Sequence, residues 1–562
     1  MVKPARAKAI QVEVVLEEQA NEVGPERGDK RQPQRWVAVA SGAGALLFCL
    51  ATYLLQLDRV VGMYVDDAWY VLLAKALATG QGYTLTNSPS QGILPLYPPA
   101  FPCLLSLVYR LAPQFPENVW LLKSISIAAM LGVGVTAYFY FVRERRLPPY
   151  VALGIAVATV ISPPLIFFAT ATVMSECVFM LSQLLTIVVI ERCLRAGKKG
   201  RGPYALLGAA LASFAFLTRS IGIVLVVGTI LYLLKERLLR TAVVFAAAVL
   251  LFVGPWTFYA SMHAPTAEQQ EEQGSYVVRS YLTQLRQSNA AEASLGTATV
   301  KDFAARVRLS TLRLMRSEVG FAFVAPLTDF LKGLSPRGGE IFVYSLSLIA
   351  IAGFISAARR RVTLAEIVVP LSLIIIVAWP WPPQRFVLPL APFLIFYILM
   401  GVRLVHGLYQ RLRQTTNFHA PWTAAAVVVW CAVAINTLSN VGNFLSLHGP
   451  PSERPKRVQS FEEVEAMFKW VRETIPQENV IATFNPALVH LYTGHKTIFP
   501  DDPTGNWNNW RRPGVRYLVF TPWHREPNFS PTESRYNVVY QSRSNQNLRV
   551  VDLDVKRVET VK

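Results

Sequence analysis

The stretch Tyr64-Val65-Asp66-Asp67-Ala68-Trp69-Tyr70 places two adjacent carboxylates just after the first apolar segment of a largely apolar chain. Ionised side chains at a bilayer surface cost desolvation free energy unless they bind a partner. The pair therefore predicts a site for a cation, a proton or a substrate hydroxyl, and it makes the chain a candidate membrane enzyme.

The composition predicts an α-helical polytopic membrane protein. Of 562 residues, 52% are apolar and only 16% are charged, and the mean hydropathy is +0.33. Soluble proteins carry about 25% charged residues. The net charge of +19 comes largely from Arg and Lys clusters between apolar segments. Such clusters are typical of cytoplasmic loops, so they do not indicate nucleic-acid binding. The five cysteines show no metal-ligand spacing and indicate packing.

A membrane-spanning helix needs about 20 mostly apolar residues. By this measure the sequence predicts about eleven spans. They are 36–57, 119–142, 149–168, 175–192, 203–218, 220–235, 239–260, 339–357, 363–380, 386–402 and 421–439. The first apolar segment is longer than a usual signal peptide and has no clear cleavage site after it, so we expect an uncleaved helix.

The distribution of positive charge predicts the orientation of these spans. Basic residues at Arg27, Lys30, Arg31 and Arg35 place the N-terminus in the cytoplasm. The loops that are then predicted to be cytoplasmic are also the basic ones: Arg143–Arg146, Arg192–Arg201, Lys235–Arg237, Arg359–Arg361 and Arg403–Arg413. Residues 1–35 mix both charge signs without apolar periodicity, which predicts a disordered cytoplasmic tail.

The segments predicted on the outer face are long: 58–118, 261–338 and 440–562. Residues 67–80 alternate at helical spacing and end at Gly80, which predicts an amphipathic helix on the membrane surface. A second juxtamembrane helix is predicted over about 103–112, after the turn Tyr97–Pro102.

Residues 36–439 are therefore predicted to form the membrane domain, and residues 58–118 are its catalytic outer loop. Residues 440–562 are predicted to form a small extracytoplasmic α/β domain. In that domain a helix is expected over 461–474 and strands over 480–484, 517–520, 537–541 and 548–553. His490, His495, Asp501 and Asp502 match no metal-ligand spacing and are interpreted as solvated loop residues.

Few charged residues lie near the outer ends of the predicted spans, and together they suit phosphate chemistry. They are Asp66, Asp67, Glu176, Arg219 and Arg385. Arginine presents a rigid fork of donors to phosphate oxygens, while carboxylates hold a divalent cation or take a proton from a hydroxyl. Alone, each arginine is also consistent with an interfacial anchor, and Ser175-Glu176 with an ordinary helix cap.

Four motifs in residues 36–400 resemble the GT-C superfamily of polytopic glycosyltransferases, in the branch of aminoarabinose lipid A transferases and protein O-mannosyltransferases. They are Asp66–Leu77, Tyr97-Pro98-Pro99-Ala100-Phe101-Pro102, Ser175-Glu176 and Arg385–Pro392, and Thr218-Arg219-Ser220 also fits. The resemblance implies inverting transfer of a sugar from a polyprenyl-phosphate donor to a lipid, glycan or protein acceptor on the outer face of the cell (inner) membrane. Lipid A, a cell-wall polymer and a secreted protein are all open as acceptors.

The resemblance also implies roles for the residues. Asp66 is expected to take the acceptor proton as the catalytic base, with Asp67 as its catalytic partner. Glu176, Arg219, Arg385 and Tyr97 are expected to bind substrate or the lipid phosphate. Asp67 and Glu176 are the candidate ligands of a divalent metal (Mg, Mn or Zn). One departure is visible: aminoarabinose transferases carry a lysine before the double proline, where this chain has Tyr97.

Two alternatives to an enzyme are a transporter or flippase and a non-catalytic scaffold for lipid-linked sugars. A transporter usually places its charges at mid-membrane on broken helices and shows internal repeats, and neither feature is evident in the sequence. A scaffold does not need acidic and arginine residues on one face. Loss of Asp66 discriminates between these classes, because a scaffold tolerates it and the enzyme does not.

Overall fold

The computed structural model describes residues 31–62, 64–90, 92–93, 97–266, 269, 280–288, 296–412, 422–500, 514–521 and 537–553, with side chains from residue 40 onward. The chain divides into two compact units, residues 1–48 and 49–562. Helix α2 (Arg31–Leu55) begins within the tail predicted to be disordered, and the rest of that tail, residues 1–30, lies outside the described residues. The second unit holds every other described helix and the sheet.

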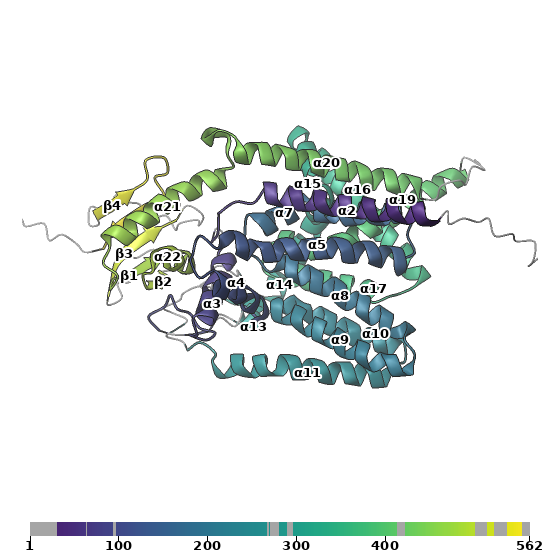
Figure 1. Ribbon diagram of the computed structural model, residues 1–562, viewed down its shortest axis with the longest axis horizontal. Helices are drawn as coiled ribbons and strands as arrows, with labels where there is room; N and C mark the ends of the chain where they lie inside the picture. Colours follow the sequence, from purple (N-terminus) through teal and green to yellow (C-terminus); the bar gives the residue numbers. More distant parts are fainter. Residues whose placement is uncertain are drawn as a thin grey trace, which may run out of the picture. The chain divides into compact units, whose positions relative to one another are not determined.

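Long apolar helices form most of the second unit (Figure 1). They are α5 (Val119–Arg143), α8 (Glu176–Arg195), α9 (Lys198–Thr218), α10 (Ile223–Lys235), α11 (Leu239–Met262), α16 (Pro336–Arg360), α17 (Ala365–Ala378), α19 (Ala391–Leu412) and α20 (Thr423–His448). Two shorter helices, α6 (Pro149–Val160) and α7 (Pro163–Thr170), meet at an angle of 50°. The bend lies just before Pro163-Pro164, where proline interrupts helical hydrogen bonding.

Every segment predicted to span the membrane contains a helix, but the number of spans is not confirmed. Among the described residues, six helices are long and apolar enough to cross a membrane, or seven if α6 and α7 form one bent span. Helices α10 and α17 have 13 and 14 residues. At 1.5 Å per residue they are shorter than a hydrocarbon core of about 30 Å. The chain is thus a multi-pass membrane protein with six or seven candidate spans among its described residues.

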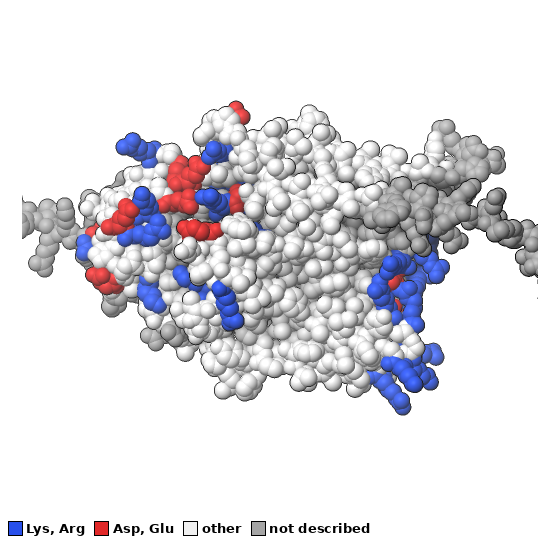
Figure 2. Space-filling model, in the orientation of Figure 1, with Lys and Arg blue, Asp and Glu red and all other residues white. Residues whose placement is uncertain are grey.

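The basic turns predicted to be cytoplasmic meet at one end of the helix bundle. Glu144, after α5, contacts Arg192 and Arg195 at the end of α8. Lys235 of α10 donates a hydrogen bond to the carbonyl of Val362, after α16. Figure 2 shows Lys and Arg gathered at one end of the molecule and mixed charges near the sheet at the other. Their common location fits the predicted topology, and the assignment of this end to the cytoplasm stays a prediction.

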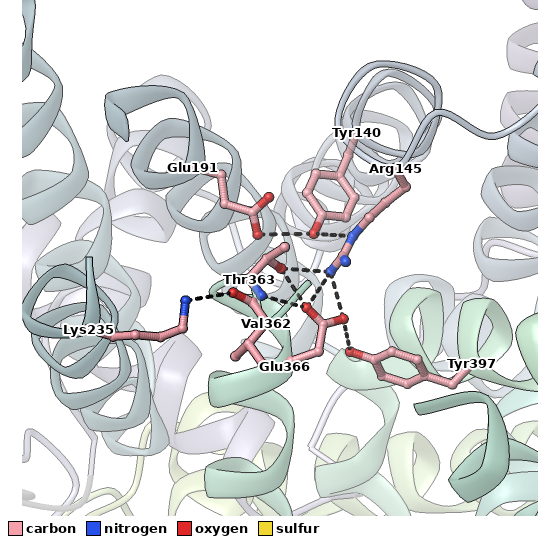
Figure 3. A network of polar contacts seen from close by, with 8 residues as sticks. All are labelled: Tyr140, Arg145, Glu191, Lys235, Val362, Thr363, Glu366 and Tyr397. Atoms are coloured by element: carbon pink, nitrogen blue, oxygen red, sulfur yellow. Dashed lines mark hydrogen bonds and ion pairs between the residues drawn. The ribbon is translucent and has the colours of Figure 1, made fainter. Parts of the chain in front are cut away.

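A buried polar network joins α5, α8, α17 and α19 at this basic end (Figure 3). The Arg145 guanidinium donates to both oxygens of Glu366, at 2.9 and 3.1 Å, and to the Tyr140 hydroxyl at 2.9 Å. Tyr140 donates to Glu191, and Tyr397 donates to Glu366 at 3.0 Å. The side chains of Arg145 and Glu366 are only 8% and 1% exposed. The network therefore ties four helices together in a site shielded from water.

Replacement of Arg145 by methionine is expected to destabilise the protein by about 3–5 kcal/mol, because Glu366 would remain buried without its counter-charge. The measurement is the thermal unfolding midpoint of the purified protein in detergent. The matched control is Arg146→Met, since Arg146 is exposed and adjacent. Equal midpoints for the two variants would contradict a stabilising role of the network.

Short elements surround the end of the bundle that carries the acidic pair. They are α3 (Asp66–Ala78), α4 (Ala100–Leu111), α13 (Tyr281–Arg286), α14 (Val300–Arg313), the π-helical turn η4 (Leu314–Glu318), α15 (Val319–Leu334), α18 (Gln384–Val387) and the 3-10 turns η1 (Ser220–Gly222), η5 (Leu388–Leu390) and η6 (Pro451–Glu453). The two predicted juxtamembrane helices correspond to α3 and α4. However, an amphipathic surface helix would expose one face to solvent, and no residue of α3 is exposed. Nine of its residues are buried, and it packs against α4 and α22 (Pro486–Thr493).

The C-terminal part contains a five-stranded sheet with the order β2-β1-β3-β5-β4. Its strands are β1 (Val480–Thr483), β2 (Thr497–Ile498), β3 (Val515–Phe520), β4 (Asn537–Gln541) and β5 (Arg549–Asp552). The first three pair in parallel, while β5 pairs antiparallel with β3 and β4. Ala482, Leu518, Phe520 and Val551 form the centre of its apolar core.

Helix α21 (Lys456–Thr474) precedes the sheet and α22 follows β1. The four predicted strands and the predicted helix coincide with β1, β3, β4, β5 and α21, whereas the two-residue strand β2 was not predicted. Helix α20 continues to His448, past the expected boundary at residue 440. Because residues 49–562 form one compact unit, a separate extracytoplasmic domain stays a prediction.

Candidate active site

Asp66 is the first residue of α3 and lies between a tyrosine and an arginine. The Tyr97 hydroxyl donates to its Oδ1 at 2.6 Å. The Arg385 Nη2 forms an ion pair with its Oδ2 at 2.6 Å. The Asp66 side chain is 14% exposed and that of Arg385 is 30% exposed, so both remain accessible to a ligand. The structure thus brings Tyr97, Asp66 and Arg385 together.

The local sequence explains where Arg385 lies. Helix α17 ends at Ala378, and the segment Trp379–Pro383 contains three prolines that prevent the helix from continuing. A new turn, α18, then begins at Gln384 and carries Arg385. The proline segment therefore places the guanidinium at the end of the bundle where α3 also begins.

Asp67 has a different environment from its neighbour. It is fully buried, and its carboxylate accepts hydrogen bonds from the backbone amides of Gly62 (2.8 Å), Tyr64 (3.1 Å) and Ala68 (3.0 Å). Burial raises the pKa of Asp67 to about 7, although the amides of Gly62 and Ala68 act in the opposite direction. Its oxygens are occupied by the backbone, so Asp67 holds the turn that starts α3. The geometry gives no support to a second catalytic carboxylate.

A second acid–arginine pair lies at the start of α8. Arg219 follows α9 in an extended conformation, and its Nη1 forms an ion pair with Glu176 Oε1 at 2.7 Å. The same nitrogen donates to Ser175 Oγ at 3.2 Å, and that hydroxyl also bonds to the Tyr70 hydroxyl at 2.9 Å. The side chain of Ser175 makes no capping bond to α8. Its hydroxyl instead connects α3 to Arg219.

Aromatic rings join the two acid–arginine pairs. The guanidinium carbons of Arg385 and Arg219 lie 4.9 and 5.7 Å from the ring centroid of Phe386, within cation–π range. On the α3 side, the Tyr70 ring meets the Tyr97 ring edge to face, with centroids 5.0 Å apart. Four charged groups therefore border one region that is walled by aromatic side chains.

Tyr281 of α13 is a further neighbour of this region. It hydrogen-bonds to Ser220 and interacts electrostatically with Arg219, Asp66 and Arg385. Burial raises the pKa of Tyr281 to about 12, so its hydroxyl is protonated at neutral pH and can donate. Helix α13 belongs to a polar stretch of sequence without periodicity, which is why the sequence gives no signal for Tyr281. Tyr70 and Phe386 lie within the motifs Asp66–Leu77 and Arg385–Pro392, and that membership is the signal that could have identified them.

The residues present do not fit a divalent metal held by Asp67 and Glu176. Asp67 is bonded to backbone amides, and Glu176 is paired with Arg219. No group of three or more His, Cys, Asp or Glu residues suited to a metal occurs within the described parts of the chain.

His490 and His495 are not solvated loop residues as predicted. His495 is fully buried, and its carbonyl contacts Nδ1 of His490 at 2.8 Å on α22. Burial lowers the pKa of His490 to about 4. Both histidines belong to the packing of the C-terminal part. Asp501 and Asp502 lie outside the described residues.

Comparison with known proteins shows similarity in structure but not in sequence. No family model matches the chain, and no curated protein is similar to it in sequence. The crystal structure of ArnT from Cupriavidus metallidurans bound to undecaprenyl phosphate superposes with a TM-score of 0.55 and 13% identity. The match covers 92% of this chain and 97% of ArnT.

A second similar structure is the oligosaccharyltransferase AglB from Archaeoglobus fulgidus in complex with an inhibitory peptide and a dolichol-phosphate. It matches with a TM-score of 0.50 and 12% identity, over 86% of this chain and 70% of AglB. A crystal structure of the Archaeoglobus fulgidus oligosaccharyltransferase in complex with Zn and sulfate has a TM-score of 0.53 and 13% identity, over 84% of this chain and 67% of that one. Each of these likenesses extends over most of the chain. The protein therefore has the fold of the GT-C superfamily of membrane glycosyltransferases.

Proposed function

We propose that this protein transfers a sugar from a polyprenyl-phosphate-linked donor to a lipid, glycan or protein acceptor on the outer face of the cell membrane, with inversion. The observation that carries the proposal is the Asp66 carboxylate, held between the Tyr97 hydroxyl and the Arg385 guanidinium in a GT-C fold. The donor class is supported by the undecaprenyl phosphate and dolichol-phosphate in the ArnT and AglB structures.

Asp66 is the proposed general base. It takes the proton of an acceptor hydroxyl or amide as that acceptor atom forms a bond to the anomeric carbon of the sugar. The bond from this carbon to the phosphate oxygen breaks in the same displacement, so the configuration inverts. Tyr97 orients the carboxylate through its hydrogen bond to Oδ1. The products are the glycosylated acceptor, protonated Asp66 and a polyprenyl phosphate.

The two arginines are proposed to bind the phosphate of the donor and to stabilise the charge it gains on leaving. A guanidinium has five N–H donors in a planar fork, so it can serve a carboxylate and a phosphate oxygen together. Arg385 and Arg219 flank Phe386 from nearby elements. Their pairing with Asp66 and Glu176 keeps the region close to neutral before an anionic donor adds its charge. No step is assigned to a metal.

The test is transfer of radiolabelled sugar by the purified protein in detergent. A panel of donors with different sugars on undecaprenyl or dolichyl phosphate is combined with lipid, glycan and peptide acceptors. The expected result is transfer of at least one sugar with inverted anomeric configuration in the product. An EDTA arm belongs in the assay, because loss of transfer on chelation would reveal a metal that the described residues do not hold.

Donor binding without transfer, across the whole panel, would contradict the proposal. That result would favour a scaffold or a flippase for lipid-linked sugars. Retention of the anomeric configuration would contradict the single displacement, and with it the role of Asp66 as a base.

A further inference from the structure

The C-terminal part contacts the loop that leads into α3. Asn485 lies between β1 and α22, and its Nδ2 donates to the carbonyl of Gly62 at 2.9 Å. The backbone amide of Gly62 in turn donates to Asp67 Oδ2 at 2.8 Å. Asn485 and Asp67 are both fully buried. A continuous chain of two hydrogen bonds therefore runs from the C-terminal part to the residue next to the proposed base.

The side chain of Leu488 packs closely against the backbone of Gly62. Gly62 has a φ of +93°, a conformation that residues with a Cβ rarely adopt, and a Cβ at this position would collide with Cδ1 of Leu488. Leu488 is on α22 and is fully buried. Hydrogen bonding and packing from the same C-terminal segment thus converge on one glycine, which fixes both its position and its orientation.

The position of Gly62 bears directly on Asp66. The Asp67 carboxylate accepts hydrogen bonds from the backbone amides of Gly62, Tyr64 and Ala68. The backbone amide of Asp67 donates a hydrogen bond to the carbonyl of Tyr64 at 2.9 Å. These bonds fold the loop against the first turn of α3, where Asp66 is the preceding residue. A displacement of Gly62 would rotate this turn and move the Asp66 carboxylate away from its bonds to Tyr97 and Arg385.

Other contacts hold the same two segments together. Asp58 pairs with Lys123 of α5 at 2.8 Å and with Arg457 of α21 at 3.2 Å. Thr497 donates its amide to the carbonyl of Asn87 at 2.8 Å, which attaches the outer loop beside strand β2. These contacts would keep the C-terminal part docked without Asn485, so loss of this one side chain should act locally.

We propose that Asn485 is a positioning residue for the transfer reaction, acting through Gly62 and Asp67 on the Asp66 carboxylate. This inference rests on the proposed function. A purely local role in capping α22 is not supported by the contacts, because the Asn485 side chain makes no capping bond to that helix. The C-terminal part then contributes to the active site without touching the substrate.

The test is a double-mutant cycle in the sugar-transfer assay, using the full-length protein. Asn485→Ala is expected to lower kcat by about tenfold to a hundredfold, because small displacements of a reacting group cost this much, and to change KM for the donor less than twofold. In an Asp67→Asn background the same change is expected to cause no further loss, since the link is already broken. Asn479→Ala is the matched control, because the Asn479 side chain donates a hydrogen bond to the nearby carbonyl of Pro476. This variant is expected to keep the wild-type kcat.

Equal fractional losses in both backgrounds, or an unchanged kcat in Asn485→Ala, would overturn the inference while the proposed function stood. No transfer by the wild type would overturn both. If Asn485→Ala does not elute as a folded monodisperse species, Gly62→Ala tests the same link, with Gly80→Ala as control. Gly80 has a similar φ of +77° but open space around it. Loss of kcat in Gly62→Ala alone supports the link, and equal rates in both variants overturn it.

Discussion

Asp66→Asn is expected to lower the rate of sugar transfer by about 10²–10⁴-fold, the range that a positioned general base contributes. The side-chain amide has nearly the same shape as the carboxylate, so packing around α3 should not change. It cannot take a proton from the acceptor, and it loses the ion pair that the carboxylate forms with Arg385 at 2.6 Å. The measurement is kcat with the best donor and acceptor from the panel, with donor binding followed separately.

The matched control is Glu473→Gln on α21, a carboxylate whose side chain is 64% exposed and far along the chain from the candidate site. This variant should transfer sugar at the wild-type rate. If Asp66→Asn retained more than a tenth of wild-type kcat, Asp66 would not be the base. Loss of donor binding together with transfer would instead assign Asp66 to substrate binding.

Arg385→Ala is expected to lower kcat by about 10²–10³-fold, since removal of one preorganised donor to a developing anion costs this much. The charge that gathers on the leaving phosphate would lose a cation, and Asp66 would lose its partner. Arg385→Lys should fall between the alanine variant and the wild type, because lysine keeps the positive charge but lacks the planar fork. The measurement is kcat and donor KM for the three proteins.

Arg454→Ala provides the matched control. Arg454 forms an exposed ion pair with Glu462 at 2.8 Å, and a surface pair of this kind contributes about 0–1 kcal/mol to stability. Its loss should leave transfer unchanged. A wild-type kcat in Arg385→Ala would remove this arginine from the proposed mechanism and leave Arg219 as the candidate phosphate ligand.

Much of the secondary structure could be predicted because it depends on local composition. Apolar segments of spanning length predicted helices such as α5, α11 and α20, and short stretches of strand-like sequence predicted β1 and β3. Strand β2 was missed because two residues carry no periodicity, and it exists only because it pairs with β1. Helix α3 packs against α4 and α22, and these contacts bury nine of its residues, which no local pattern records.

The candidate site was predictable in part for a similar reason. Short motifs identified Asp66, Tyr97 and Arg385, which the fold brings into direct contact. Tyr281 could not be identified, because only the tertiary structure brings this polar stretch of the chain close to Asp66 and the two arginines. The metal assignment to Asp67 and Glu176 rested on residue type. In the structure, Asp67 is bonded to backbone amides and Glu176 Oε1 forms an ion pair with Arg219.

The sequence by itself determined that this is a polytopic helical membrane protein with an acidic pair beside its first apolar segment, because hydropathy and residue type are local properties. Only the tertiary structure decided which carboxylate of the pair contacts Arg385. Adjacent residues on a helix point about 100° apart, so one must turn away from any site that the other faces. The backbone amide of Gly62, in the loop before α3, donates a hydrogen bond to Asp67. Asn485, 423 residues further along the chain, donates a hydrogen bond to the carbonyl of the same glycine. Contacts over such a separation follow from packing in three dimensions, and no pattern within either segment contains them.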